Sequence, residues 1–248
     1  AGLAASSLDC TLYGHTRTAA RMAPLEAAGV TRLDSARELA RKARYVVMAV
    51  KPYQIEALLA EMAPEFGPDT VVISVAAGIS IARLQAAVAG RCPVVRCMPN
   101  TPALVGKGVF ALCFDDKVPA ESKEDILRFF SQLGVCLELP ESRFTAFSAL
   151  IGAGPAYVFG MMQGLVQAGV TLGLGRKDCR DMVAALFEGS AVMAARSDTP
   201  LMELRDQVCS PGGLTIAGVN VLDRAGLSGL LVDAVLAADE RGREMEKE

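Results

Sequence analysis

The stretch YVVMAV at residues 45–50 decides the fold class, together with TVVISV at residues 70–75. Both are nearly continuous apolar runs, which are typical of strands that are covered on both faces of a sheet. Residues 54–62 lie between them and have helical spacing of apolar side chains. This strand, helix, strand order predicts βαβ units and a mostly parallel sheet.

The same alternation extends outward from about residue 10 to about residue 139. It predicts further strands at residues 10–14, 93–97, 109–114 and 135–139. It predicts further helices at residues 17–28, 36–43, 81–88 and 119–133. We therefore expect a doubly wound α/β domain in this part of the chain.

The composition changes after Pro140. Residues 144–245 are rich in Ala, Leu, Met and Gly and lack bounded β-branched runs, which predicts an all-α domain of four or five helices. We place the domains at residues 1–142 and 143–248. The expected helices at 155–171 and 177–195 are apolar on most faces. Their apolar surface is larger than an α domain of about 105 residues can bury by itself. Dimerisation through these helices is the simplest solution.

Bulk properties exclude several functional classes. The chain has 248 residues, of which 52% are hydrophobic, and 25 basic against 28 acidic residues without a block of like charges, so a nucleic-acid partner is not indicated. We see no apolar run near the ~18 residues of a membrane span. The seven cysteines are odd in number and include no C-x-x-C, which favours reduced core thiols and a cytoplasmic protein.

The chain opens at Ala1 without methionine, on residues that resemble the tail of a helix. We expect that something precedes them. A targeting peptide could be part of it, so a mitochondrial location stays open.

A doubly wound sheet binds dinucleotides at the carboxyl ends of its strands, so the loops there are candidate cofactor contacts. In the first loop, Thr16 and Arg17 offer a hydroxyl and a cation where an NAD site usually has an acidic residue. This favours NADPH over NADH, although Arg17 could simply be the first exposed residue of the next helix. His15 beside them lacks partner ligands, so we predict no metal site.

Three further loops follow the expected strands. In Ala49-Val50-Lys51-Pro52, the proline opens a helix and leaves backbone groups free for the nicotinamide ribose, although Lys51 could be a solvated charge. Ala76 and Ala77 are small enough for a flat ring to approach, but the signal is weak. Asn100-Thr101-Pro102 adds an amide and a hydroxyl, or is an Asx turn before a proline.

The segment at residues 210–218 is a candidate anion site. Ser210 can cap a helix, Pro211 suits the first helical position, and Gly212 and Gly213 leave backbone amides uncovered. Such a helix end can hold a carboxylate without an arginine, and Thr215 adds a hydroxyl there. An ordinary capped helix is the equal alternative.

Five motifs together resemble the motif series of pyrroline-5-carboxylate reductases. They are AVKP at 49–52, VAAG at 75–78, RCMPNTP at 96–102, GAGPAY at 152–157 and SPGGLT at 210–215. Their order and spacing fit over essentially the whole chain.

The resemblance implies NADPH- or NADH-dependent reduction of L-1-pyrroline-5-carboxylate to L-proline, the last step of proline biosynthesis. It implies an N-terminal Rossmann-like domain and an α-helical dimerisation domain, with larger rings of dimers in some members. The hydroxyl of Thr215 would then lie nearest the imine nitrogen. The residues implied for the cofactor are Thr16, Arg17, Ser35, Ala49, Val50, Lys51, Pro52, Ala76, Ala77, Asn100 and Pro102, and those for the substrate carboxylate are Ser210, Gly212, Gly213, Leu214 and Thr215.

The sequence departs from the family pattern in three places. The strand and glycine-rich turn that open the family's fold are absent, so we expect about twenty further residues upstream. Ser35 and Ala36 stand where an asparagine often contacts the adenosine ribose. Leu214 is larger than usual, and Leu150 and Ile151 precede Gly152 where small polar residues are common, so the carboxylate pocket would be slightly tighter.

Two other functions compete. A β-hydroxyacid dehydrogenase of the same architecture would use a lysine on a helix of the α domain, but residues 154–173 contain none. A nucleotide-sensing or scaffold protein would keep the fold without turnover.

Overall fold

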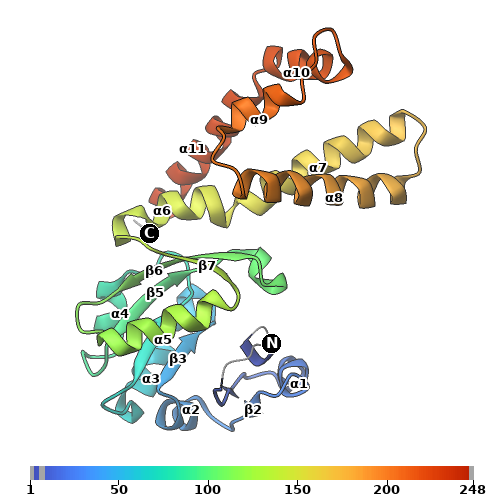
Figure 1. Cartoon of the computed structure of the whole chain (residues 1–248). Helices are drawn as coiled ribbons and strands as arrows, with labels where there is room; N and C mark the ends of the chain where they lie inside the picture. The colour runs from blue at the N-terminus through green and yellow to red at the C-terminus, as the bar shows by residue number, and fades with distance from the viewer. Residues whose placement is uncertain (1–2, 6–8, 246–248) are drawn as a thin grey trace. The chain divides into compact units, whose positions relative to one another are not determined.

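The computed structural model describes residues 3–5 and 9–245. The chain forms two compact units, Ala1–Gly152 with Asp239–Glu248, and Ala153–Ala238 (Figure 1). The first unit thus extends past the change in composition at Pro140. The functional division at residues 142 and 143 stays a prediction.

The first unit contains a five-stranded sheet. Its order is β3 (Tyr45–Met48), β4 (Val71–Ser74), β5 (Val94–Met98), β6 (Gly108–Phe114) and β7 (Gly134–Glu138). Strands β3, β4 and β5 are parallel, β6 runs antiparallel to β5, and β7 is parallel to β6. The carboxyl ends of β3, β4 and β5 therefore lie along one edge, as a mostly parallel sheet requires.

Helices cover both faces of this sheet, which confirms the doubly wound prediction. Val46, Met48 and Val72 pack with residues of α2 (Ala36–Lys42), α3 (Pro52–Met62) and α4 (Ile81–Ala87). On the opposite face, Val71 and Ile73 pack with residues of α5 (Ala120–Ser131). Both Val71 and Val72 are buried because successive side chains of a strand point to opposite faces.

Short helical segments connect these elements. They are η2 (Ala63–Glu65), η3 (Thr101–Val105) and η4 (Glu141–Arg143), followed by α6 (Phe144–Phe147) and the π-helix η5 (Ser148–Gly152). Phe144 and Phe147 are buried against Ala111 of β6. This packing explains why the first unit continues beyond Pro140.

The N-terminal part forms a separate two-stranded parallel sheet of β1 (Tyr13–Gly14) and β2 (Thr31–Arg32), with η1 (Leu3–Ala5) before it and α1 (Ala19–Glu26) between the strands. The strand expected at residues 10–14 is thus only its last two residues, and β2 was not expected from the pattern. In the described part of the chain, no ladder joins β1 or β2 to the larger sheet. The only partner of β1 in that part of the chain is the two-residue strand β2, so few ladder hydrogen bonds are available to lengthen β1.

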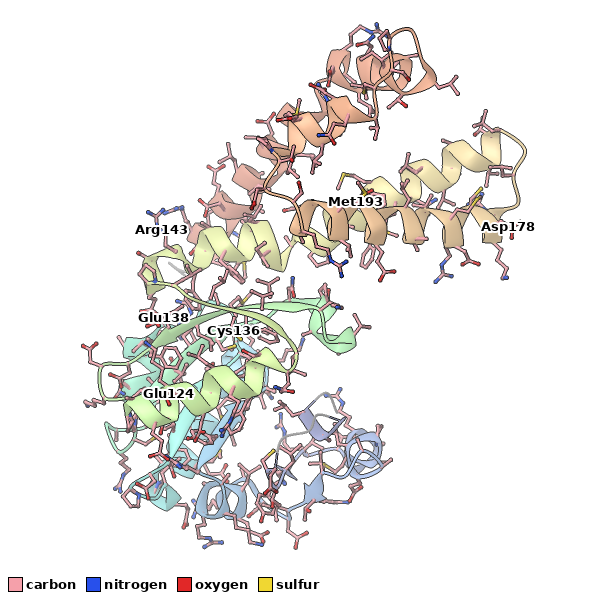
Figure 2. All side chains as sticks on the ribbon, in the orientation of Figure 1. Glu124, Cys136, Glu138, Arg143, Asp178 and Met193 are labelled. Atoms are coloured by element: carbon pink, nitrogen blue, oxygen red, sulfur yellow. The ribbon has the colours of Figure 1, made fainter. Side chains whose placement is uncertain are left out.

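The second unit is helical, as predicted. It contains α7 (Gly154–Thr171), α8 (Arg176–Ala195), α9 (Leu201–Gln207), α10 (Leu214–Arg224) and most of α11 (Leu227–Met245). Figure 2 shows Asp178 and Met193 near the two ends of α8. Gly173 has a positive φ of 90°, so it ends α7 in the left-handed conformation that glycine favours.

Much of the apolar surface of these helices is exposed. Val166, Cys179 and Val183 are buried between α7 and α8. In contrast, Phe159 and Leu186 are 64% and 55% exposed. Apolar side chains exposed over several helices are typical of a surface that another chain covers.

The helical run Glu141–Thr171 is long and apolar enough to cross a membrane by length and composition, with a mean hydropathy of 1.4. The sequence-based expectation of no such segment was too strict, because this run mixes Gly, Ala and Ser with larger apolar residues. One such helix is weak evidence for a membrane, because apolar helices that pack in soluble proteins meet the same criterion.

The cysteines are free thiols. Burial raises the pKa of the Cys97 thiol well above its usual range and that of Cys92 to about 11. Both side chains are therefore protonated at neutral pH.

Candidate active site

Three loops meet at the carboxyl edge of the parallel strands. Met48 pairs with Ser74, and Ser74 pairs with Arg96, so the strands end at nearly the same level. The loops that follow carry most of the predicted cofactor residues, which are Ala49, Val50, Lys51, Pro52, Ala76, Ala77, Asn100 and Pro102. The structure thus brings these eight residues to one edge of the sheet.

The loop after β3 presents the open end of a helix. Pro52 is the first residue of α3 and Lys51 is its N-cap, without a side-chain hydrogen bond to the helix. The Lys51 side chain is exposed. Backbone N–H groups at such an end carry partial positive charge, which suits a ribose hydroxyl or a phosphate.

The loop after β4 has little side-chain cover. Ala77 and Gly78 are exposed, and Gly78 has a φ of 74°, a conformation that disfavours any side chain. Ala76 is buried, and its N–H donates to the Ser74 hydroxyl at 3.3 Å. The backbone of Ala77 and Gly78 is exposed, and the hydrogen bond of Ala76 holds the start of the loop in place. A flat ring can therefore approach this backbone closely.

The loop after β5 is held by Asn100. Its Oδ1 accepts a hydrogen bond from the Val109 N–H at 2.9 Å, and its Nδ2 donates to the Ile151 carbonyl at 3.3 Å. Asn100 therefore bonds to backbone groups nine and 51 positions further along the chain, where an Asx turn would have bonded within its own loop. Pro102 lies in η3 and is half-buried.

The residues expected at the adenosine end are Thr16, Arg17 and Ser35. Arg17 is exposed and Thr16 half-buried, in the loop after β1. The Ser35 hydroxyl accepts a hydrogen bond from the Glu38 N–H at 3.1 Å, so it caps α2. His15 Nδ1 lies 3.1 Å from the Leu33 carbonyl, which ties this loop to the end of β2.

The predicted anion site is a turn followed by a helix, and the expected capping was wrong. Gly213 is the N-cap and α10 begins at Leu214, so neither Ser210 nor Pro211 belongs to the helix end. The Gly213 N–H donates to the Ser210 carbonyl at 3.0 Å, and Gly212 has a φ of 65°. Proline at the second position and a positive-φ glycine at the third position are typical of a type II turn.

The start of α10 is nevertheless open. Gly213 makes no side-chain cap, and Thr215 is exposed in the first turn. In an 11-residue helix the first N–H groups have no intrahelical acceptor. This end can therefore bind an anion, with the Thr215 hydroxyl beside it.

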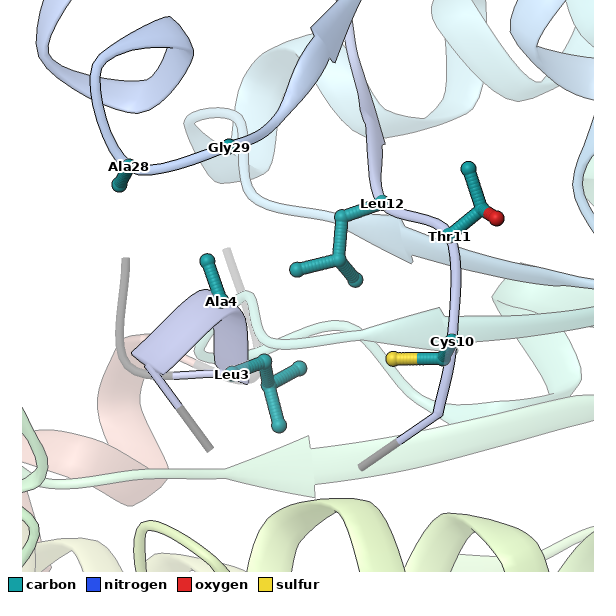
Figure 3. Close-up of a pocket in the computed structure, with 7 residues that line it drawn as sticks. All are labelled: Leu3, Ala4, Cys10, Thr11, Leu12, Ala28 and Gly29. Carbon is teal, nitrogen blue, oxygen red and sulfur yellow. The ribbon is translucent and has the colours of Figure 1, made fainter. Parts of the chain in front are cut away.

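A cavity of about 260 Å³ lies elsewhere in the first unit. Figure 3 shows its lining, which includes Leu3, Cys10, Leu12 and Gly29. Its lining contains none of the predicted site residues. The candidate regions are therefore the loop edge in the first unit and, described separately, the start of α10 in the second.

Comparisons with known proteins identify the family. A family model for pyrroline-5-carboxylate reductase dimerisation matches residues 141–245, and one described as NADP oxidoreductase, coenzyme F420-dependent, matches residues 2–78. The pyrroline-5-carboxylate reductase of Corynebacterium melassecola is 37% identical over 222 residues, which are 88% of this chain and 82% of that protein. The chain belongs to the pyrroline-5-carboxylate reductase family.

Solved structures of pyrroline-5-carboxylate reductases share the whole fold. The Plasmodium falciparum enzyme with NADP bound has a TM-score of 0.85 at 31% identity and covers 99% of this chain and 92% of its own. The Coxiella burnetii enzyme has a TM-score of 0.88 at 29% identity, with 98% and 92% covered. These relatives confirm the predicted class and fold and disfavour the β-hydroxyacid dehydrogenase and scaffold alternatives.

Sequence reasoning did not find every residue that shapes the loop edge. Arg96 was recognised only as part of a motif, and Glu141, which lies beside the predicted domain boundary, was not singled out. The structure joins their side chains at 2.9 Å directly behind the loop edge. An arginine in an otherwise apolar strand was the available signal, since a buried cation requires a partner.

Proposed function

We propose that this chain reduces L-1-pyrroline-5-carboxylate to L-proline, the last step of proline biosynthesis, with NADPH as the preferred reductant and NADH as a possible one. The observation that carries the proposal is the open start of α10. It offers a carboxylate site without an arginine in a member of a family of imine reductases.

The carboxyl edge of the sheet has the features that a dinucleotide needs. We assign Ala49 to Pro52 to the ribose next to the nicotinamide, and Ala76 with Ala77 to the nicotinamide ring. We assign Asn100 and Pro102, in the loop after β5, to the side of the cofactor site at the same edge. When bound, the reduced nicotinamide supplies the hydride that converts the C=N bond to an amine.

We assign Thr16 and Arg17 to the adenosine 2′-phosphate. The guanidinium of Arg17 is exposed and can form paired hydrogen bonds to phosphate oxygens. The Ser35 hydroxyl already caps α2, so its contact to the adenosine ribose would use its second lone pair or its own hydrogen.

We assign the substrate carboxylate to the turn of Ser210, Gly212 and Gly213 and to the first N–H groups of α10, at Leu214 and Thr215. The partial positive charge of the helix end balances the carboxylate. The Thr215 hydroxyl then hydrogen-bonds the ring nitrogen and helps to hold the proton that this nitrogen needs as the carbon is reduced. Correct placement of the two reactants supplies most of the rate.

The test is to follow NADPH oxidation by its absorbance with pyrroline-5-carboxylate and to identify proline by mass spectrometry. We expect one proline per NADPH consumed. A 3-hydroxy acid with NADP⁺ is the control substrate and should give no turnover. Turnover of the hydroxy acid, or none with pyrroline-5-carboxylate, would contradict the proposal.

We further propose a homodimer formed through the helices of residues 143–248, a possible ring of such dimers, and a cytoplasmic location. The exposed apolar side chains of α7, α8 and α11 support an association through this part of the chain. Free thiols at all seven cysteines support a reducing compartment. Light scattering coupled to size exclusion gives the number of subunits directly.

A further inference from the structure

One carboxylate connects three segments behind the cofactor edge. Glu141 Oε1 accepts a hydrogen bond from Arg96 Nη1 at 2.9 Å and from the backbone N–H of Ile81 at 2.8 Å. Arg96 lies in β5, and Ile81 is the first residue of α4. Glu141 itself belongs to η4, in the connection between β7 and α6, which Figure 2 marks by the labels Glu138 and Arg143 on either side.

Burial makes this connection strong. Arg96 is only 7% exposed, and its guanidinium lies 4.7 Å from the centre of the buried Phe144 ring. A buried cation that loses its anionic partner is strongly disfavoured. Glu141 is therefore held in place by Arg96, and its position in turn determines where the Ile81 N–H can lie.

The Ile81 N–H is the far end of the loop between β4 and α4. At the near end, the Val75 N–H donates to the Met48 carbonyl and the Ala76 N–H to the Ser74 hydroxyl, both at 3.3 Å. Between these anchors lie the exposed residues Ala77 and Gly78. Both ends of this short loop are thus fixed, and Glu141 holds the far one.

We propose that Glu141 is a positioning residue for the cofactor, which acts through Ile81 to fix the backbone of residues 76–80 against which the nicotinamide ring lies. This inference rests on the proposed function, which assigns Ala76 and Ala77 to the nicotinamide. Arg96 supports the same role by holding the carboxylate. Neither Glu141 nor Arg96 needs to touch the substrate or the cofactor.

Two variants test the Glu141–Ile81 hydrogen bond, one at its acceptor and one at its donor. Glu141→Gln keeps the shape of the side chain but removes its charge, which weakens the hydrogen bonds that its oxygen accepts from Arg96 and from the Ile81 N–H. Ile81→Pro removes the N–H and replaces the half-buried isoleucine side chain with a smaller apolar ring, at the first helical position where proline is tolerated. The preceding Ser80 has φ −77° and ψ 160°, the backbone region preferred before proline. Glu138→Gln is the matched control, since Glu138 binds Lys123 on the exposed side of β7.

The readouts are the Kd for NADPH by titration calorimetry and the hydrogen exchange of residues 76–80. We expect both Glu141→Gln and Ile81→Pro to raise the Kd at least threefold over Glu138→Gln and to speed exchange in that loop. The KM for NADPH should rise while the KM for pyrroline-5-carboxylate at saturating NADPH stays within twofold, which a general loss of stability would not produce.

A Kd within threefold of the control for either variant would overturn the inference. If Glu141→Gln fails to fold, Ile81→Pro carries the test, because it leaves the Arg96–Glu141 ion pair in place. Wild-type protein that binds NADPH but does not reduce pyrroline-5-carboxylate would count against the proposed function and leave this binding comparison valid.

Discussion

The side-chain amide of Asn100 donates a hydrogen bond to the backbone carbonyl of Ile151, 51 positions further along the chain, at 3.3 Å. The orientation of this amide is fixed, because its oxygen accepts from the Val109 N–H and its nitrogen must face a carbonyl. Pro155 lacks the N–H that an α-helix would direct at the carbonyl of Ile151. Asn100 thus supplies the donor that the proline cannot.

Replacement of Asn100 should therefore cost stability as well as cofactor affinity. Asn100→Ala leaves two half-buried backbone groups without this partner, which we expect to lower the free energy of unfolding by about 1–3 kcal/mol. Asn100→Asp keeps an acceptor for Val109 but puts an oxygen against the Ile151 carbonyl. Hydrogen exchange at the Val109 amide should be fast in the alanine variant and still protected in the aspartate variant. Equal protection of that amide in wild type and Asn100→Ala would contradict this role.

The sequence predicted the position of strand β4 but not the hydrogen-bond partners of Asn100. Strands β3 and β4 were predictable because strands covered on both faces need continuous apolar runs, and a parallel order places their following loops at one edge. The partners of Asn100 and Glu141 were not, because a side-chain hydrogen bond across 51 or 60 positions leaves no local pattern. The start of α10 was misplaced because proline suits both a first helical position and the second position of a turn.

Thr215 should contribute through its hydroxyl. Thr215→Val keeps the branched shape but cannot hydrogen-bond the ring nitrogen, so we expect kcat/KM for pyrroline-5-carboxylate to fall about tenfold, or about 1.4 kcal/mol. Thr215→Ser keeps the hydroxyl and should stay within about threefold of wild type. Steady-state kinetics at saturating NADPH measure both variants. A Thr215→Val enzyme within about twofold of wild type would remove Thr215 from the mechanism.

Gly212 should matter for substrate binding beyond its conformational strain. Its φ of 65° costs an alanine about 1–2 kcal/mol, although no atom lies within 4 Å of the added Cβ. Gly226 has the same properties, with a φ of 72°, and follows the far end of α10. Gly212→Ala and Gly226→Ala should lower the melting temperature similarly, but only Gly212→Ala should raise the KM for pyrroline-5-carboxylate. Equal kinetic effects in both would show that the turn acts only through stability.

Cys92 should make stability depend on pH in alkaline solution. Burial, with Asp115 nearby, raises the pKa of this thiol from 9.0 to about 11. Above pH 9 the unfolded chain loses the thiol proton and the folded chain keeps it, so the stabilisation present at lower pH is lost as the pH rises. The Cys92 contribution should fall by about 1 kcal/mol between pH 8 and pH 10. Urea unfolding of wild type and Cys92→Ala at both pH values measures it, and an unchanged pH dependence in the variant would contradict the assignment.

Arg17 should decide between the two nicotinamide cofactors. Its guanidinium is exposed in the loop after β1, and two charge-assisted hydrogen bonds to a 2′-phosphate are worth about 1.5–3 kcal/mol each. Arg17→Ala should therefore raise the KM for NADPH at least tenfold and change the KM for NADH less than about twofold. Arg21→Ala is the matched control, since Arg21 is an exposed arginine one turn further along, in α1. A fall in affinity for both cofactors alike would place Arg17 away from the 2′-phosphate, and an equal effect of Arg21→Ala would reduce its role to general electrostatic attraction.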